Sequence, residues 1–301
     1  MSLVSCPLAP RSVIRLGGPD RHAFLQGLVS NDVHLVTRDT AIYAALLTPQ
    51  GKFLHDLFII ESGDAFLIDC EAARAEDLLK RLAAYKLRAK VNLEDAVNDF
   101  EIRAIWDSSS PRKRGSIERD SAHINRREDI IVFNDPRLPE LGQRIIVKKG
   151  TAISNIPATD FPAYDHHRLA LGVADGSRDM IVEKSTLTDG NFDLLNGISW
   201  TKGCYVGQEL TARMHYRALV KKRMFPVRIE GAAPSFGATI TLNGEEIGDM
   251  RSSAGEVGIA LLSVEKMKDV TESNALLLSG ASRLTAGKPN WMETRESGDV
   301  A

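Results

Sequence analysis

The chain has 301 residues, enough to bury a sizeable core and more than a usual single domain, so its length predicts two or three domains. Its 38 lysine and arginine residues nearly balance its 40 aspartate and glutamate residues, which excludes a global field that would draw it to nucleic acid or an anionic membrane. No apolar run approaches the length of a bilayer span and the start lacks a signal-peptide pattern, so we expect a soluble, unexported protein.

The three cysteines, Cys6, Cys70 and Cys204, lie far apart and form no CxxC pair. This spacing argues against a disulfide framework and against a zinc or iron–sulfur site built from four thiolates of one chain. We therefore expect a reducing compartment and no metal site made by this chain alone.

The first hundred residues predict a mixture of strands and helices. Residues 18–32 have apolar side chains at helical spacing after a polar start and predict a short amphipathic helix. Short β-branched or aromatic runs between turn residues predict strands at 42–48, 53–60, 65–70, 90–97 and 100–107. This order favours an α+β fold over a regularly alternating parallel one.

The clearest helix is predicted at residues 71–87, where apolar side chains, the last of them Tyr85, recur on one face. Glu76 lies four residues before Lys80, which predicts an exposed ion pair on the opposite face.

The middle of the chain predicts a loop, a hairpin and a helix. Residues 108–128 are polar and charged without apolar periodicity, which is typical of a long surface loop. Turn chemistry predicts a hairpin at 129–149, and a glycine-closed helix follows at 160–176. His166 and His167 are adjacent and would point about 100° apart on that helix, which disfavours a metal site there.

The last third of the chain predicts a small antiparallel barrel or sandwich. Its short strands are separated by Gly, Asn and Ser turns and lie at 223–231, 238–253, 256–263 and 275–280. The polar end, residues 291–301, is predicted to be a frayed tail.

The stretch SWTKGCYVGQEL at 199–210 carries the clearest chemical signal. An ammonium at Lys202 beside the Cys204 sulfur would favour the thiolate and make it more nucleophilic or more oxidisable. Gly203 and Gly207 would let backbone N–H groups approach a ligand closely. A buried cysteine beside a tight glycine turn is the alternative, and these residues alone leave it open.

A helix predicted at 207–218 follows this stretch. Glu209 lies at its start, and Arg213 and Arg217 are four residues apart on one face. A loop that feeds a helix edged with cations suits an anionic ligand, whereas solvated surface arginines are the alternative.

The segment KGCYVGQE at 202–209 resembles the signature of the YgfZ family, folate-binding proteins related to the aminomethyltransferase, or T protein, of the glycine cleavage system. Other segments recur in the order of that family: FLQGLVSNDV at 24–33, ALLTPQGKFLHDLFI at 45–59, RLALGVADG at 168–176, NFDLLNGISWTKGCYVGQE at 191–209 and GDMRSSAGEVGIALL at 248–262. The resemblance therefore covers most of the chain.

The resemblance implies a three-domain aminomethyltransferase-like cloverleaf, an α+β fold of antiparallel sheets plus helices with a C-terminal small β-barrel. It implies two interleaved α+β domains within residues 1–220, one made of roughly 1–45 plus 98–220 and the other of roughly 46–97. The barrel would span 221–290, ahead of the polar tail.

The resemblance also implies what the protein does. A central channel would bind tetrahydrofolate or a derivative, and the protein would support assembly or repair of iron–sulfur proteins and, through them, tRNA modification. The expected partners are reduced folate and iron–sulfur client or assembly proteins, with no direct DNA binding and no membrane. The expected location is the bacterial cytoplasm or, in a eukaryote, the mitochondrial matrix.

Asp189 stands where relatives use a glutamate to accept two parallel N–H donors of the pterin, and Asp193 is the nearby alternative. The ring of the folate would need an aromatic wall, for which Phe192 is one candidate, and its glutamate tail a cation, for which Arg223 is one. Besides Asp189, the predicted folate-binding set is Asn31, Trp200, Tyr205, Glu209 and Arg213.

The predicted catalytic set is Cys204, Lys202 and Asp56, with Cys204 as a redox-active thiol or a transient sulfur or metal contact. The aminomethyltransferases carry an acidic pair where this chain has His55 and Asp56, and they place a further acid where it has Ala170. These departures argue against glycine cleavage as the function of the protein. If the protein is an enzyme, the resemblance implies a folate-dependent one-carbon transferase.

Two alternatives remain open at this stage. One is a tetrahydrofolate-dependent aminomethyltransferase of the glycine cleavage type. The other is a tRNA-binding module that would use residues 111–127 and 221–223, which the near-neutral net charge disfavours.

Overall fold

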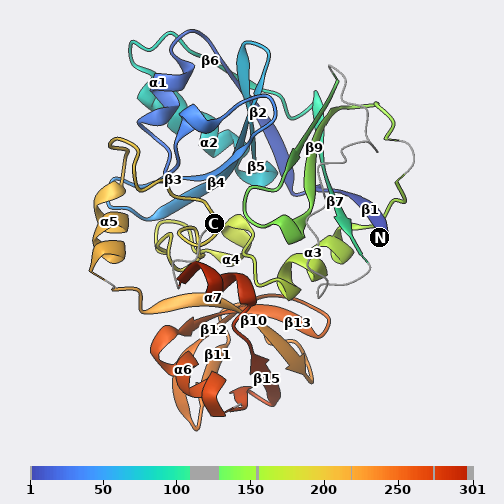
Figure 1. Cartoon of the computed structure of the whole chain (residues 1–301), viewed down its shortest axis with the longest axis vertical. Coiled ribbons are helices and arrows are strands. Elements are labelled where there is room, and N and C mark those ends of the chain that lie inside the picture. The colour runs from blue at the N-terminus through green and yellow to red at the C-terminus, as the bar shows by residue number, and fades with distance from the viewer. Residues whose placement is uncertain (1, 109–128, 154–155, 218, 274, 297–301) are drawn as a thin grey trace. The chain divides into compact units, whose positions relative to one another are not determined.

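The computed structural model describes two compact units of the chain (Figure 1). The first unit comprises Met1–Pro49, Leu54–Phe161 and Leu195–Gln208, and the second Gln50–Phe53, Pro162–Leu194 and Glu209–Ala301. The described residues are 2–108, 129–153, 156–217, 219–273 and 275–296, so nearly all of the loop predicted at 108–128 lies outside them. None of the helices in these ranges has both the length and the apolar character needed to cross a membrane.

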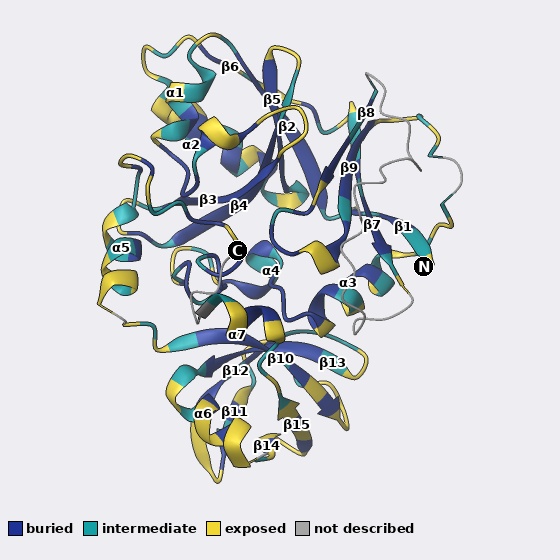
Figure 2. Ribbon diagram, viewed as in Figure 1, coloured by how far each residue is buried: buried dark blue, intermediate teal, exposed yellow. Residues whose placement is uncertain are grey.

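A five-stranded sheet forms the larger part of the first unit. Its strands lie in the order β3 (Ile42–Leu47), β4 (Phe53–Ser62), β5 (Ala65–Glu71), β2 (Arg11–Gly17) and β6 (Asn92–Asp95). β5 runs antiparallel to both β4 and β2. The centres of β4 and β5 are buried along nearly every residue, as Figure 2 shows in dark blue, which explains their continuous apolar runs.

A four-stranded antiparallel sheet completes the strands of this unit. Its order is β1 (Leu3–Pro7), β7 (Phe100–Asp107), β9 (Gln143–Lys148) and β8 (Ile130–Asn134). β8 and β9 form the hairpin predicted at 129–149. One face is apolar and packs around Ile105, Val132 and Ile145.

The predicted domain boundaries differ from the strand pairing. Residues 1–45 were expected to belong with 98–220, but β2 lies between β5 and β6 and β3 also belongs to the five-stranded sheet. Only β1 joins the four-stranded sheet, by pairing with β7 about a hundred residues later. Such long-range pairing leaves no local signal, and β1 and β2 are strands that the pattern of the sequence did not predict.

Two helices belong to the first unit, α1 (Arg21–Gln26) and α2 (Ala75–Lys86), and both were predicted. The predicted ion pair of α2 is present, with Glu76 Oε1 2.6 Å from Lys80 Nζ. The predicted apolar face is wrong at one position, because Tyr85 is exposed. The helix ends one residue later, where Leu87 takes a positive φ of 40°.

The second unit contains a closed barrel, which decides between the two architectures predicted for this region. Its strand order is β10 (Lys222–Glu230), β13 (Val257–Ser263), β12 (Glu245–Ala254), β11 (Thr239–Leu242), β14 (Leu277–Ser279) and β15 (Ser282–Ala286). Val227 and Ile229 are buried and alternate with the exposed Arg228 and Glu230, as the two faces of a barrel strand require.

Helices complete the second unit: α3 (Phe161–Ala170), α4 (Gly176–Asp179), α5 (Gln208–Tyr216), α6 (Val264–Ser273) and α7 (Asn290–Glu296). The start of the predicted polar tail is therefore wrong, because α7 is a helix with Trp291 and Met292 buried. Trp291 Nε1 donates to the backbone oxygen of Leu171 at 2.8 Å. The two apolar residues stand in a polar stretch and their partners lie far away in the sequence, so the local pattern did not predict this helix.

Candidate functional site

Cys204 reaches the protein surface, whereas Cys6 and Cys70 are buried, and all three are free thiols. Burial raises the pKa of Cys6 to about 11 and also raises the pKa of Cys70, which keeps both thiols protonated and inert at neutral pH. Cys204 is therefore exposed, as a role in contact with another molecule requires, and its nearness to a folate stays a prediction. Of the three, it is the thiol that a second molecule can reach.

Lys202, two residues before this thiol, is buried and bonded to a distant turn of the first unit. Its Nζ donates to the backbone oxygens of Gln26 at 2.8 Å, Val29 at 2.6 Å and Asn31 at 2.8 Å. An ammonium has three N–H donors, so these three carbonyls use all of them. Burial lowers the pKa of Lys202 to about 8, against a smaller opposing effect of Asp32.

Further hydrogen bonds join the loop around Cys204 to the same turn. They run from Ser199 N to Ser30 O (3.0 Å), Ser30 Oγ to Gly197 O (2.6 Å), Asn31 Nδ2 to Asn196 O (2.7 Å) and Val206 N to Gly27 O (3.1 Å). Two of the segments that carry the family resemblance, near residues 27 and 200, are thus neighbours in space. The hydrogen bonds between the two segments fix the backbone on both sides of the Cys204 thiol.

This geometry corrects the expected role of Lys202 and redefines that of Asn31. The Lys202 ammonium is committed to carbonyl oxygens, so it positions the loop and has no N–H left for the Cys204 sulfur. The Asn31 amide also donates to Tyr43 O at 2.8 Å, and its oxygen accepts from the backbone N–H of Asp32. Its contact with a folate stays a prediction.

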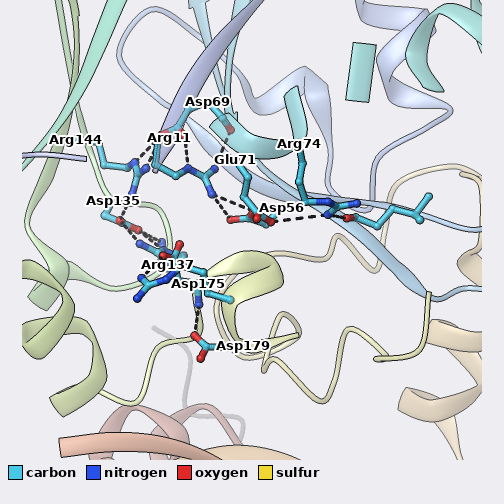
Figure 3. Close-up of polar contacts among 12 residues, drawn as sticks. Arg11, Asp56, Asp69, Glu71, Arg74, Asp135, Arg137, Arg144, Asp175 and Asp179 are labelled. Carbon is cyan, nitrogen blue, oxygen red and sulfur yellow. Dashed lines mark hydrogen bonds and ion pairs between the residues drawn. The ribbon is translucent and has the colours of Figure 1, made fainter. Parts of the chain in front are cut away.

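Asp56 is buried and lies in an ion-pair network (Figure 3). Arg11 Nη1 lies 3.0 and 2.9 Å from the two oxygens of the Asp56 carboxylate, and Arg11 Nε donates to Asp69 at 2.6 Å. A carboxylate held by a guanidinium is a weak base, because protonation would break the pair. The arrangement counts against Asp56 as a proton acceptor in catalysis.

His55, the other half of the altered acidic pair, is buried and neutral at neutral pH. Burial lowers its pKa to about 4, and the nearby Arg74 acts in the same direction. Its Nε2 lies 2.9 Å from Asp77 Oδ2, while its Nδ1 is buried without a hydrogen-bond partner among the described residues. Such an imidazole is a poor general acid or base at neutral pH.

Asp189, the predicted pterin acceptor, lies in a turn of the second unit. Its Oδ2 accepts from the backbone N–H of Thr186 at 2.8 Å. Burial raises the pKa of this carboxyl, and the Thr186 hydrogen bonds and the charges of Lys52 and Arg251 oppose that rise only in part. Two N–H donors from a ligand would stabilise the ionised form of this carboxyl, and its contact with a pterin stays a prediction.

Two charged residues of β12 stand near Asp189, and the sequence did not single them out. Arg251 Nη2 lies 2.8 Å from Asp249 Oδ1, and the Arg251 side chain is almost fully buried. Burial raises the pKa of Asp249, the Arg251 charge lowers it, and Asp189 adds a smaller rise. The sequence signal that could have identified these residues is the pair of opposite charges, Asp249 and Arg251, within the strand segment GDMRSS.

The remaining predicted residues of the second unit are paired with one another. Asp193, the alternative pterin acceptor, forms a buried two-bond pair with Arg223 at 2.8 and 2.7 Å, so the structure commits both groups to each other. Arg213 and Glu209 form an exposed pair at 2.5 Å on α5.

The aromatic candidates differ in exposure. Tyr205 is buried with its ring centroid 5.1 Å from Lys202 Nζ, and Phe192 is buried with its centroid 6.2 Å from that of Phe53. Both are core residues of their units. Trp200 is half-buried on the Cys204 loop, and its contact with a folate ring stays a prediction.

Comparison with known proteins identifies the barrel and the fold. Residues 221–294 match the C-terminal β-barrel domain of the CAF17 family. The chain is also similar to a solved structure, the glycine cleavage system aminomethyltransferase T from Bartonella henselae, with a TM-score of 0.75 over 97% of this chain and 87% of that one. At 15% identity this likeness shows the fold alone, and it confirms the predicted aminomethyltransferase-like architecture.

Curated relatives cover nearly the whole chain. The human mitochondrial iron–sulfur cluster assembly factor IBA57 is 34% identical over 94% of this chain and 84% of its own length, and the mouse protein of the same name is 31% identical over the same shares. A homologue in Pyricularia oryzae is 33% identical over 91% of this chain. The chain therefore belongs to the IBA57 family of iron–sulfur cluster assembly factors, the group with YgfZ and CAF17 that its sequence resembles.

Proposed function

We propose that this chain is a tetrahydrofolate-binding factor that supports assembly or repair of iron–sulfur proteins through the Cys204 thiol. One observation carries the proposal: Cys204, the exposed thiol, lies on a loop that Lys202 fixes by three hydrogen bonds to backbone carbonyl oxygens. Its partners are iron–sulfur assembly or client proteins of the bacterial cytoplasm or the mitochondrial matrix. Any effect on tRNA modification is indirect, through an iron–sulfur enzyme.

The chemistry assigned to Cys204 is that of a transient soft ligand. A thiolate binds iron or accepts sulfur, and an exposed thiolate does so without opening the fold. The described residues contain no group of three or more His, Cys, Asp or Glu side chains that could hold a metal ion. A cluster carried at Cys204 would therefore take further ligands from the partner protein or from small thiols.

A complementation experiment tests the thiol. Cells that lack their own relative receive the wild type, Cys204→Ser or the control Thr201→Ser, which changes an exposed neighbour on the same loop. We expect the wild type and the control to restore an iron–sulfur reporter enzyme and Cys204→Ser to fail, although its purified form keeps the wild-type Tm. Full restoration by the serine variant would end the proposed role of the thiol.

Calorimetric titration with tetrahydrofolate tests the second half of the proposal. A preformed cleft with few polar anchors supports binding in the micromolar range or weaker, roughly −8 kcal/mol or less favourable. We expect Asp189→Asn to bind about ten- to a hundredfold more weakly, since charged hydrogen bonds contribute about 1.5–3 kcal/mol. The exposed Asp64→Asn serves as the control. Equal affinity of Asp189→Asn and the wild type would remove Asp189 from the site.

A tetrahydrofolate-dependent aminomethyltransferase is the competing function. The buried neutral His55, the Arg11-bound Asp56 and the alanine at 170 all argue against it. Turnover with an aminomethyl-lipoyl carrier that survives Cys204→Ser would establish the transferase instead.

A further inference from the structure

Arg251 is the buried cation of the second unit whose hydrogen-bonding groups are least satisfied. Its side chain is 3% exposed, and its Nε and Nη1 have no hydrogen-bond partner among the residues that the structure describes. Only Nη2 is bonded, to Asp249 Oδ1 at 2.8 Å. A buried guanidinium that leaves two of its nitrogens unbonded is costly, so its retention points to an acceptor that the chain does not itself supply.

Strand register places Asp249 and Asp189 on the same side of the barrel. Met224, Leu261 and Asp249 lie directly opposite one another across β10, β13 and β12, and opposite residues of neighbouring strands face the same way. The backbone N–H of Met224 donates to the backbone oxygen of Asp189 at 2.9 Å. This row therefore begins beside Asp189 and ends at Asp249.

Strand alternation brings Arg251 to the same face. Met250 faces the barrel core with no exposure, so Asp249 and Arg251, which flank it on β12, both face outward. The Arg251 guanidinium reaches back to Asp249 across this face. The pair is thus fixed near Asp189, with which both groups interact electrostatically.

The three side chains match one hydrogen-bonding pattern. Asp189 and Asp249 accept N–H bonds, and Arg251 offers unused N–H donors next to them. The aminopyrimidinone edge of a reduced folate presents an amino N–H, a ring N–H and then a carbonyl oxygen. A carboxylate takes the two donors, and a guanidinium takes the carbonyl.

We propose that Arg251, held in place by Asp249, is a specificity-determining residue that donates to the pterin carbonyl of a folate whose N–H groups bind Asp189. This inference rests on the proposed folate binding and adds a barrel residue to that site. It assigns to the barrel a direct part in recognition of the ligand.

Phe236 lies over Arg251. Its ring centroid is 5.0 Å from the Arg251 guanidinium carbon, and the residue is 52% exposed, so the ring covers the buried cation from the solvent side.

The test compares two probes of the same reduction level that differ at the pyrimidine edge. Tetrahydrofolate carries a carbonyl at position 4 and an N–H at position 3, and its tetrahydro 4-amino analogue carries an amino group at position 4 and no N–H at position 3, so the part of the preference that Arg251→Met removes reports the contact with the carbonyl. We expect the wild type to prefer tetrahydrofolate by at least tenfold in calorimetric titration. Arg251→Met should lose most of this preference, and Arg251→Lys should keep part of it because lysine still donates. Arg228→Met, which removes an exposed cation from the same barrel, is the matched control.

The outcomes separate this inference from the proposed function. Binding of tetrahydrofolate by the wild type with an unchanged preference in Arg251→Met would overturn the inference and leave folate binding standing. Absence of tetrahydrofolate binding in the wild type would overturn both. Should Arg251→Met unfold, the wild-type preference and the Arg251→Lys variant decide, since equal affinity of the wild type for both probes contradicts a donor at the carbonyl.

Discussion

Single side chains in this protein owe their charge to burial as much as to their neighbours. His55 is the clearest case, because its Nδ1 is enclosed without a partner among the described residues while Arg74 and Arg81 stand nearby. Adding a proton would bury a positive charge and an unbonded N–H at once. The residue therefore stays neutral far below its ordinary pKa.

This environment makes stability depend on pH. The unfolded His55 takes up a proton below its ordinary pKa of 6.5, whereas the folded residue does so only near pH 4, so its contribution is complete above 6.5 and lost as the pH falls to 4. We expect a loss on the order of 3 kcal/mol across that window, measured by urea unfolding. His55→Gln should flatten the profile, and the exposed His166→Gln should not. An unchanged profile in His55→Gln would contradict this assignment.

Lys202 gives a second prediction at this scale. Lys202→Met removes three donors and leaves three carbonyl oxygens of residues 26–31 without their partner, so local stability should fall by about 1–3 kcal/mol. Hydrogen exchange of the amides around residues 196–206 should accelerate accordingly. Lys80→Met, which removes an exposed pair on α2, should leave exchange there unchanged. Equal protection in both variants would refute the positioning role.

The sequence singles out Cys204 as a candidate but does not show how its neighbours act. A thiol between Lys202 and Gln208 is visible as a pattern, whereas its exposure is seen only in the structure. The direction in which Lys202 points depends on carbonyls of residues about 170 positions earlier, which no local spacing reveals. Arg251 escaped notice for the same reason, since its nearness to Asp189 depends on a segment about sixty residues earlier in the chain.

Among the elements, the two sheets of the first unit are joined by charged groups (Figure 3). Asp69 of β5 accepts from Arg11 of β2 at 2.6 Å and from Arg144 of β9 at 2.5 and 3.0 Å. The Arg144 guanidinium also lies 3.8 Å from the ring centroid of Phe58 on β4. One carboxylate thus links the five-stranded sheet to the four-stranded sheet.

Removal of this carboxylate should be costly. Asp69→Asn removes the carboxylate that two buried guanidinium groups share and leaves Arg11 with Asp56 and Arg144 with Asp135, and the loss of one charge from a buried pair destabilises by about 3–5 kcal/mol. Asp64→Asn, which removes the exposed partner of Arg15, should cost no more than about 1 kcal/mol. Chemical unfolding of both variants measures the contrast, and similar costs would show that the network adds nothing.

Helix α7 supports a further prediction for the second unit. Trp291→Ala removes a large buried ring and the donor to Leu171 O, so we expect a loss of about 3–5 kcal/mol in unfolding free energy. Trp291→Phe keeps most of the packing and loses the hydrogen bond, which should cost about 1 kcal/mol. If neither Trp291→Ala nor Trp291→Phe lowers the free energy of unfolding, α7 does not stabilise the unit.

Local pattern predicted most elements whose partners are close in the chain. The β8–β9 hairpin, the strands β4 and β5, the helix α2 and the barrel strands other than β15 all show periodicity or turn residues that act within a few positions. β1, β2 and α7 lack such signals, because each is stabilised by contacts with residues far along the chain. The strand order, and with it the domain division, depended on these elements.

At the scale of the whole molecule, charge separates two of the functions considered. With 38 basic and 40 acidic residues the protein has no net positive charge to attract a phosphate backbone. We therefore expect weak tRNA binding and a shallow slope when the logarithm of the binding constant is plotted against the logarithm of the salt concentration. Filter binding at salt concentrations from about 50 to 200 mM would measure this slope. A steep slope would revive the RNA-binding alternative.

The family and fold were accessible from the sequence because several quoted segments recur in order along most of the chain. The curated relatives and the matching barrel domain bear out that resemblance. Folate binding and the thiol chemistry rest on single side chains, Asp189 and Cys204, whose surroundings are assembled by distant segments. They are the parts that need experiment.

The closed barrel of the second unit has a consequence for how other proteins can dock there. In a closed barrel each strand is hydrogen-bonded on both sides, so β10 to β15 present no row of unpaired peptide groups. An incoming chain cannot extend this sheet by adding a strand of its own. A partner that recognises the barrel must therefore contact its side chains. Substitutions of surface side chains, rather than changes of the backbone, would alter which partner binds.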